Sequence, residues 1–127
     1  MLDHTGIQVS DLPASRAFYE RVLEPLGFAV VMDLAEQIQA VGFGRRGRPW
    51  FWIRGAKGEA SGPIHIAFHA TDRERVDRFH EAALAAGATD NGPPGLREHY
   101  HPTYYGAFVL DPDGNNVEAV CHTPPEG

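Results

Sequence analysis

Residues 63–72 read Pro-Ile-His-Ile-Ala-Phe-His-Ala-Thr-Asp, and this stretch begins the second copy of an internal repeat. A shift of the sequence by 61 positions aligns the two copies without a gap. The aligned pairs are His4 with His65, Ser10 with Thr71, Asp11 with Asp72, Phe18 with Phe79, Glu20 with Glu81 and Leu23 with Leu84. An internal repeat determines the architecture of a chain, so it is considered before single motifs. Two copies, each about half of the chain, predict two similar modules.

The first copy predicts the element order β-α-β-β-β. Residues 2–9 are expected to form a strand whose alternate residues His4, Gly6 and Gln8 share one face. The further elements expected are a helix beginning at Ser10 or Asp11 and ending at Gly27, and strands at residues 28–32, 38–43 and 50–53. Residues 55–63 are rich in Gly, Ala and Ser and are expected to link the two copies.

The second copy opens with a predicted strand at residues 64–70, in which His65, Ala67 and His69 share one face. A helix is expected from Thr71-Asp72 to Ala86-Gly87. Residues 91–96 contain two glycines and two prolines and are expected to form a loop. The remaining elements expected are a strand at 104–110, a turn at 111–114, a strand at 116–120 and a frayed tail at 123–127.

Composition indicates one globular domain of 127 residues, with modules at 1–58 and 62–122. The hydrophobic fraction of 43% and the charged fraction of 22% are ordinary. A net charge of −6 argues against nucleic-acid binding. No apolar run approaches the roughly 20 residues of a membrane span, and the N-terminus lacks the pattern of a signal peptide. Because Cys121 is the only cysteine, a reducing compartment is favoured, and we expect a cytoplasmic protein.

Three residues form a candidate metal site when the repeat is laid over itself. His4 and His65 occupy equivalent places on the first strand of each copy, and Glu118 lies in the closing strand of the second. Two curved sheets side by side would form a cleft, where repeat-related residues converge. Two imidazoles and a carboxylate suit a divalent ion such as iron, manganese, zinc, nickel or cobalt, and leave positions for water and substrate. Taken singly, each residue also fits a structural role: a strand histidine, a core histidine and a solvent-facing carboxylate.

Three segments resemble motifs of the glyoxalase / bleomycin-resistance / extradiol-dioxygenase superfamily, also called vicinal oxygen chelate proteins. Residues 2–12, Leu-Asp-His-Thr-Gly-Ile-Gln-Val-Ser-Asp-Leu, with Ser15 and Phe18-Tyr19, are similar to its opening motif. Residues 62–68, Gly-Pro-Ile-His-Ile-Ala-Phe, resemble the opening of its second module, and residues 108–118, Phe-Val-Leu-Asp-Pro-Asp-Gly-Asn-Asn-Val-Glu, its closing motif. The resemblance covers nearly the whole chain. It implies an α+β fold of two βαβββ modules pairing into a curved mixed sheet around a central cleft, with a metal held by His4, His65 and Glu118.

The chain departs from the pattern of glyoxalase I enzymes, which generally have a fourth protein ligand in the last strand of the first module. Aligning Gly47 with Gly114 places Phe51 opposite Glu118, and residues 48–54 include no acidic residue. The ligand set therefore resembles the three-ligand arrangement of extradiol dioxygenases and fosfomycin-resistance enzymes. Lactoylglutathione lyase activity is correspondingly less expected, because the site also lacks a carboxylate that could move a proton beside the metal.

Candidate acid-base residues are His69, Tyr104 and Tyr105. His69 lies on the predicted face of His65, and one of the two adjacent tyrosines must point toward the cleft if their strand lines it. A phenol there could donate to a metal-bound oxyanion. Residues 99–101, His-Tyr-His, are either a lid or surface, and residues 50–52, Trp-Phe-Trp, either an aromatic wall of the cleft or core.

The sequence therefore predicts a divalent-metal-dependent enzyme acting on a small substrate that is chelated through vicinal oxygens. Ring-cleaving dioxygenase, isomerase, lyase and thiol transferase reactions all fit three ligands, although only Arg54, Arg97 and the basic loop 45–48 support the thiol-transfer option. The alternative is a non-catalytic small-molecule binding protein, similar to the bleomycin-resistance members of the superfamily. The resemblance also makes a homodimer plausible.

Overall fold

A computed structural model describes residues 1–55 and 59–125. The first module contains β1 (Thr5–Gln8), α1 (Leu12–Leu23), the 3-10 turn η1 (Glu24–Leu26), β2 (Ala29–Leu34), α2 (Ala35–Ile38), β3 (Ala40–Arg45) and β4 (Arg48–Arg54). The second contains β5 (His65–His69), α3 (Arg73–Ala85), β6 (Thr89–Leu96), β7 (Tyr105–Leu110) and β8 (Asn116–Cys121). Parts of the expected linker (56–58) and tail (126–127) lie outside the described residues.

Each module builds a four-stranded mixed sheet with the same strand order. The first sheet runs β1-β4-β3-β2 and the second β5-β8-β7-β6. In both, the first strand pairs in parallel with the last, and the other neighbours are antiparallel. This arrangement confirms the predicted α+β fold of two βαβββ modules. Over the described residues the two sheets remain separate, so one chain alone does not join them around a closed cleft.

Equivalent residues of the repeat start the two long helices. The Asp11 side chain accepts a hydrogen bond from the Ala14 amide at 3.1 Å, and the Asp72 side chain accepts one from the Arg75 amide at 2.9 Å. Each satisfies a backbone donor that the first helical turn leaves unpaired. Gly27 and Gly87, with φ of 87° and 91°, adopt the left-handed conformation where α1 with η1 and α3 end. The helix boundaries predicted from these residues are therefore confirmed.

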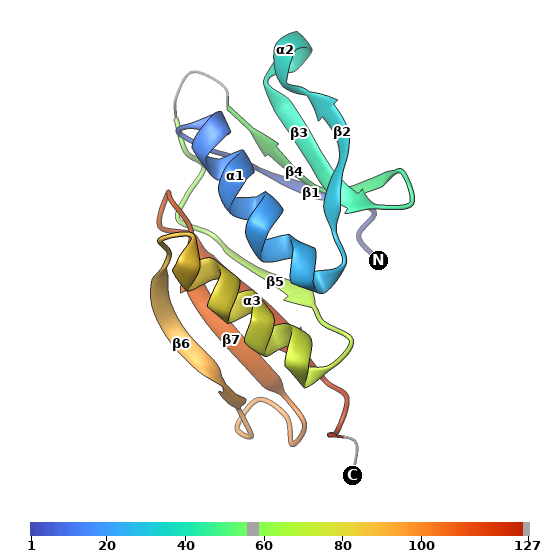
Figure 1. Cartoon of the computed structure of the whole chain (residues 1–127), viewed down its shortest axis with the longest axis vertical. Helices are drawn as coiled ribbons and strands as arrows, with labels where there is room; N and C mark the ends of the chain where they lie inside the picture. Colours follow the sequence, from blue (N-terminus) through green and yellow to red (C-terminus); the bar gives the residue numbers. More distant parts are fainter. Residues whose placement is uncertain (56–58, 126–127) are drawn as a thin grey trace.

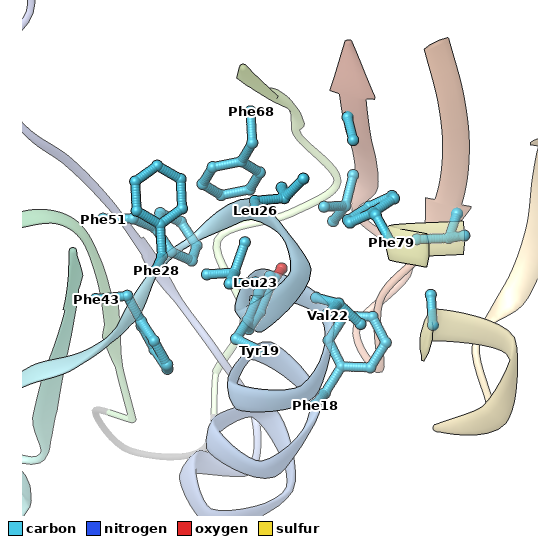
Figure 2. Close-up of a cluster of buried hydrophobic side chains, with 14 of the residues drawn as sticks. Phe18, Tyr19, Val22, Leu23, Leu26, Phe28, Phe43, Phe51, Phe68 and Phe79 are labelled. Atoms are coloured by element: carbon cyan, nitrogen blue, oxygen red, sulfur yellow. The ribbon is translucent and has the colours of Figure 1, made fainter. Parts of the chain in front are cut away.

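The hydrophobic core lies between the two modules. Helices α1 and α3 run side by side, and each covers one face of its own sheet (Figure 1). Figure 2 shows Tyr19 and Leu23 of α1 between the aromatic rings of the first module and Phe79 of α3, with Phe68 of β5 above them. Because alternate strand residues point to opposite faces, the other face of each sheet is turned away from this core.

Two expectations about the elements are wrong. Residues 91–96 are not a loop, because they belong to β6, which pairs with β7 despite shifts of register around Gly92 and Gly95. Its prolines are tolerated since β6 is an edge strand, where an amide on the open side has no partner to lose. The short helix α2 was not predicted, and the strand expected at 38–43 begins only at Ala40, after Gln39 in a left-handed conformation.

Among the described residues, no helix has the length and apolar character to span a membrane.

Candidate functional site

His65 and Glu118 meet on the outward face of the second sheet. They lie on β5 and β8, which are neighbours in parallel, with Glu118 opposite Ala67. The His65 Nε2 atom is 2.8 Å from Glu118 Oε1. Glu118 is only 1% exposed, whereas the His65 side chain is 54% exposed. The pair therefore combines a desolvated carboxylate with an imidazole that solvent or a ligand can reach.

Tyr104 contacts the second oxygen of the same carboxylate. Its hydroxyl donates a hydrogen bond to Glu118 Oε2. Gly106 makes room for this contact, since a Cβ there would lie 3.2 Å from Tyr104 Cε1 and 3.3 Å from Glu118 Oε2. Burial, and then the hydrogen bond to Glu118, raise the pKa of Tyr104 above its ordinary value. Tyr104 therefore stays protonated and holds Glu118 in place by donating to it.

His4 lies apart from this pair, on the outward face of the first sheet. Its Nδ1 atom is 2.8 Å from Asp3 Oδ1, and this contact lowers the pKa of the exposed Asp3 carboxyl. Within residues 1–55 and 59–125, no three His, Cys, Asp or Glu side chains lie close enough together to hold a metal ion. A single chain thus brings together His65 and Glu118 of the predicted set and leaves His4 elsewhere.

The donor chemistry of the three residues nevertheless fits a divalent metal ion. Buried carboxylates are normally paired or coordinate metals, and Glu118 directs Oε1 at a partly exposed imidazole nitrogen. Their separation of 2.8 Å is close to the roughly 3 Å between two donor atoms that share one ion. Among the described residues, one chain therefore brings two such donor atoms together, those of His65 and Glu118.

The equivalent of Glu118 in the first module is Trp52 and not Phe51. Gly6 pairs with Trp52 across β1 and β4 as Ala67 pairs with Glu118 across β5 and β8. The alignment on Gly47 and Gly114 was wrong by one residue, because the β3–β4 hairpin contains a register shift at Gly44. Phe51 is 2% exposed and belongs to the core, while Trp52 occupies the outward face. The place of a fourth ligand is thus filled by an indole.

The other predicted site residues divide between two surroundings. His69 lies on β5 beside a hollow of about 330 Å³ at the junction of the modules, which Arg45 and Trp50 also line. Tyr105 turns toward α3, where its hydroxyl donates to Asp77 at 2.6 Å. Burial and this hydrogen bond raise the pKa of Tyr105 to about 12. Of the two tyrosines, only Tyr104 is therefore directed at Glu118.

The loop before β7 packs against Tyr104. The rings of His99 and Tyr100 are 4.2 Å apart, and those of Tyr100 and Tyr104 are 5.1 Å apart. His122 adds a further edge contact to Tyr104, with the ring centres 5.3 Å apart. His99 and Tyr100, for which the sequence left both a lid and a surface loop open, thus pack through Tyr100 against the side chain that holds Glu118.

A hollow of about 880 Å³ lies on the outward face of the first sheet. The sequence pattern gave a candidate role to four of the side chains that line it, namely His4, Arg48, Trp52 and Arg54, and none to Gln8, Met32, Leu34 and Ile38. Gln8 was placed on the correct face but given no role. Leu34 and Ile38 reach the hollow from either end of α2, which no motif indicated.

Comparisons with known proteins agree with this architecture. A family model described as Glyoxalase/Bleomycin resistance protein/Dioxygenase superfamily matches residues 1–119. The crystal structure of a glyoxalase/bleomycin resistance protein from Albidiferax ferrireducens T118 is 30% identical, with a TM-score of 0.80 over 98% of this chain and 99% of that chain. A glyoxalase/bleomycin resistance protein/dioxygenase family enzyme from Burkholderia phytofirmans PsJN is 26% identical, with a TM-score of 0.72 over 95% and 98%.

A more distant likeness concerns the fold alone. Lactoylglutathione lyase from Agrobacterium tumefaciens is 24% identical, with a TM-score of 0.67 over 95% of this chain and 92% of that one. A search of curated proteins found no significant match.

Proposed function

The chain belongs to the glyoxalase/bleomycin resistance/dioxygenase superfamily, and we propose that it is a divalent-metal-dependent enzyme of the lyase, isomerase or dioxygenase type. Its substrate is a small molecule that binds through two neighbouring oxygens. The observation that carries this proposal is Glu118, which is 1% exposed and still directs its carboxylate at the exposed His65. Burying a carboxylate costs free energy, so a site with this composition is better explained by a ligand than by stability.

His4, His65 and Glu118 are the proposed metal-holding residues. A bound divalent ion would polarise the substrate oxygens and stabilise negative charge that develops on them. Tyr104 keeps the Glu118 carboxylate oriented through its hydrogen bond. His69 is the proposed proton acceptor; it lies on the same strand and the same face as His65, four residues along, beside the hollow that Arg45 and Trp50 also line. Classical lactoylglutathione lyase activity is less supported, since Trp52 stands at the equivalent of Glu118.

A second copy of the chain is the proposed source of His4 for each site. Within one chain the two outward faces point away from a shared core, and His4 lies on one face while His65 and Glu118 lie on the other. A C2 dimer would place the first sheet of one chain opposite the second sheet of its partner, so that two identical sites form. A cytoplasmic location, and a role without nucleic acid or membrane, stay predictions from the sequence.

Metal content tests the proposal directly. Elemental analysis of protein without a histidine tag should find about one transition-metal ion per chain, as expected for a site with one set of ligands. His65→Ala and Glu118→Gln should lose the ion. His69→Ala is the matched control, since it removes an imidazole from the same strand and face without touching Glu118, and it should keep the ion.

The identity of the ion narrows the reaction. Iron would favour oxygenation, and nickel or zinc would favour isomerase or lyase chemistry. A parent protein that stays empty after incubation with iron, manganese, zinc, nickel and cobalt would contradict the proposal, as would retention of the ion in Glu118→Gln.

The apolar hollow of the first sheet supports a second candidate, a non-catalytic small-molecule binding protein. Trp52 and its apolar neighbours can hold a flat compound without any metal. Binding of aromatic compounds that is unchanged by a chelator, in a protein that takes up no metal, would favour this function over the enzyme.

A further inference from the structure

One row of residues across the first sheet places a half-buried indole between two glycines. Gly6, Trp52, Gly42 and Met32 lie opposite one another on β1, β4, β3 and β2. A Cβ at Gly42 would lie 2.9 Å from Pro49 Cβ and 3.1 Å from Trp52 Cη2, and one at Gly6 would lie 3.2 Å from Trp52 Cβ. The Trp52 ring therefore extends over Gly42, and the two residues paired with Trp52, Gly6 and Gly42, have no side chains, so part of the ring stays accessible.

The space beside this indole has an apolar wall. Met32 is 38% exposed and Ile38 is 52% exposed, and together with Leu34 they border the hollow of about 880 Å³. Exposed large apolar side chains that gather around a concave surface mark binding sites more often than isolated ones do. Trp52, Met32, Leu34 and Ile38 are named the apolar platform below.

Arg54 places a positive charge at one end of the platform. It follows Trp52 by two residues on β4, so both side chains are on the same face, and it lies opposite Gln8. Within the part of the chain that the structure describes, Arg54 has no carboxylate within ion-pair distance, whereas Arg48 at the other end lies 3.8 Å from Asp3. An exposed guanidinium without an anion beside an apolar surface is suited to the carboxylate of a ligand.

We propose that the site binds an aromatic carboxylate, with its ring against the Trp52 indole and its carboxylate at Arg54. This inference rests on the proposed function, because His4 of the proposed metal-holding set also lines this hollow, and the inference names the substrate class of that site. Ring stacking on Trp52 supplies apolar contact, and the bidentate geometry of the guanidinium selects a planar anion over a neutral group of the same shape. Arg54 and Trp52 are therefore specificity-determining residues.

Binding of two probes of the same shape tests the inference. Titration calorimetry with the full chain should show that 2-naphthoate binds about 10-fold or more tightly than 2-naphthamide, as expected for a charge-assisted hydrogen bond. Arg54→Gln should bind both probes alike, and Trp52→Ala should weaken both. Arg46→Gln, which removes an exposed arginine from the β3–β4 turn outside the hollow, should keep the preference.

Metal content measured on the same samples separates this inference from the proposed function. Arg54→Gln that keeps its metal and loses the preference for naphthoate supports the inference. A parent protein that contains metal but binds both probes equally, or binds neither, overturns the substrate class and leaves the enzyme proposal intact. A metal-free parent that still prefers naphthoate supports the ligand class while the enzyme proposal fails. An unchanged preference in Arg54→Gln overturns the role of Arg54.

Discussion

Glu118 illustrates how a residue that looks ordinary in sequence acquires a special environment. A glutamate near the end of a chain is usually solvated, but here it is 1% exposed and both of its oxygens have partners. The partners come from 53 and 14 positions away. No local pattern connects such residues, so only the repeat and the family resemblance indicated Glu118. The contact with Tyr104 could not be predicted, because it depends on the space left by Gly106.

Tyr105 gives a prediction at the scale of a single hydrogen bond. Its hydroxyl donates to Asp77 and ties β7 to α3. Tyr105→Phe keeps the ring and removes this bond, so the free energy of unfolding at pH 8 should fall by about 1 kcal/mol. Urea unfolding of the two proteins measures the difference. Equal stability would show that solvent replaces Asp77 without cost.

The pH dependence of that difference has a defined sign. The folded pKa of Tyr105, about 12, is above the ordinary value of 10.0, so the folded state favours the protonated phenol. Its contribution is fully present below pH 10.0 and is lost as the pH rises through about 12. The stability of the parent should therefore fall toward that of Tyr105→Phe over this interval. Two curves that stay parallel up to pH 12 would contradict the assignment.

The turn between β7 and β8 connects the two modules. Asp111 is buried, and its side chain accepts hydrogen bonds from the Tyr19 hydroxyl of α1 at 2.5 Å and from the amides of Asp113 and Asn115, each at 2.9 Å. Asn115 in turn accepts from the Ile64 amide at 3.0 Å. This segment was predicted as a turn, and that is correct. Because Asp111 is hydrogen-bonded to Tyr19 of α1, the turn also joins the second module to the first.

Asp111→Ala should destabilise the whole fold. It leaves the Tyr19 hydroxyl and two turn amides without their acceptor, and we expect a loss of about 2–4 kcal/mol in the free energy of unfolding. Asp113→Ala is the matched control, because it removes a carboxylate from the same turn. The contact of that carboxylate with Ser10 is exposed, so the variant should lose about 1 kcal/mol or less in the free energy of unfolding. Similar losses for both variants would show that the buried contact is not special.

The elements that the sequence predicted are those with local signals. Asp11 and Asp72 cap helices, and Gly27 and Gly87 end them, because backbone geometry at those places favours these residue types. Strand β6 was missed since its glycines and prolines indicate a loop, and only its pairing with β7 makes it a strand. Helix α2 has four residues and no capping side chain, so it carries no signal.

At the scale of the molecule, the repeat predicted two modules and not how they pack. The alternation along β1 and β5 was correct, and it placed His4 and His65 on the faces that lie opposite the buried residues. Alternation of exposed and buried residues along a strand does not show how two modules pack. It is the same whether their sheets join or their helices pack against each other. The structure has the second arrangement, because Tyr19, Leu23, Phe68 and Phe79 form one core. A second chain is then needed to complete the proposed site.

Complementation between two defective chains tests that claim most directly. Chains carrying His4→Ala and chains carrying Glu118→Gln should each bind no metal alone. When they are co-expressed, a mixed dimer has one site with all its ligands, so the purified mixture should contain about a quarter of the parent's metal if chains pair at random in a C2 dimer. A mixture as empty as the separate variants would contradict a site shared between two chains.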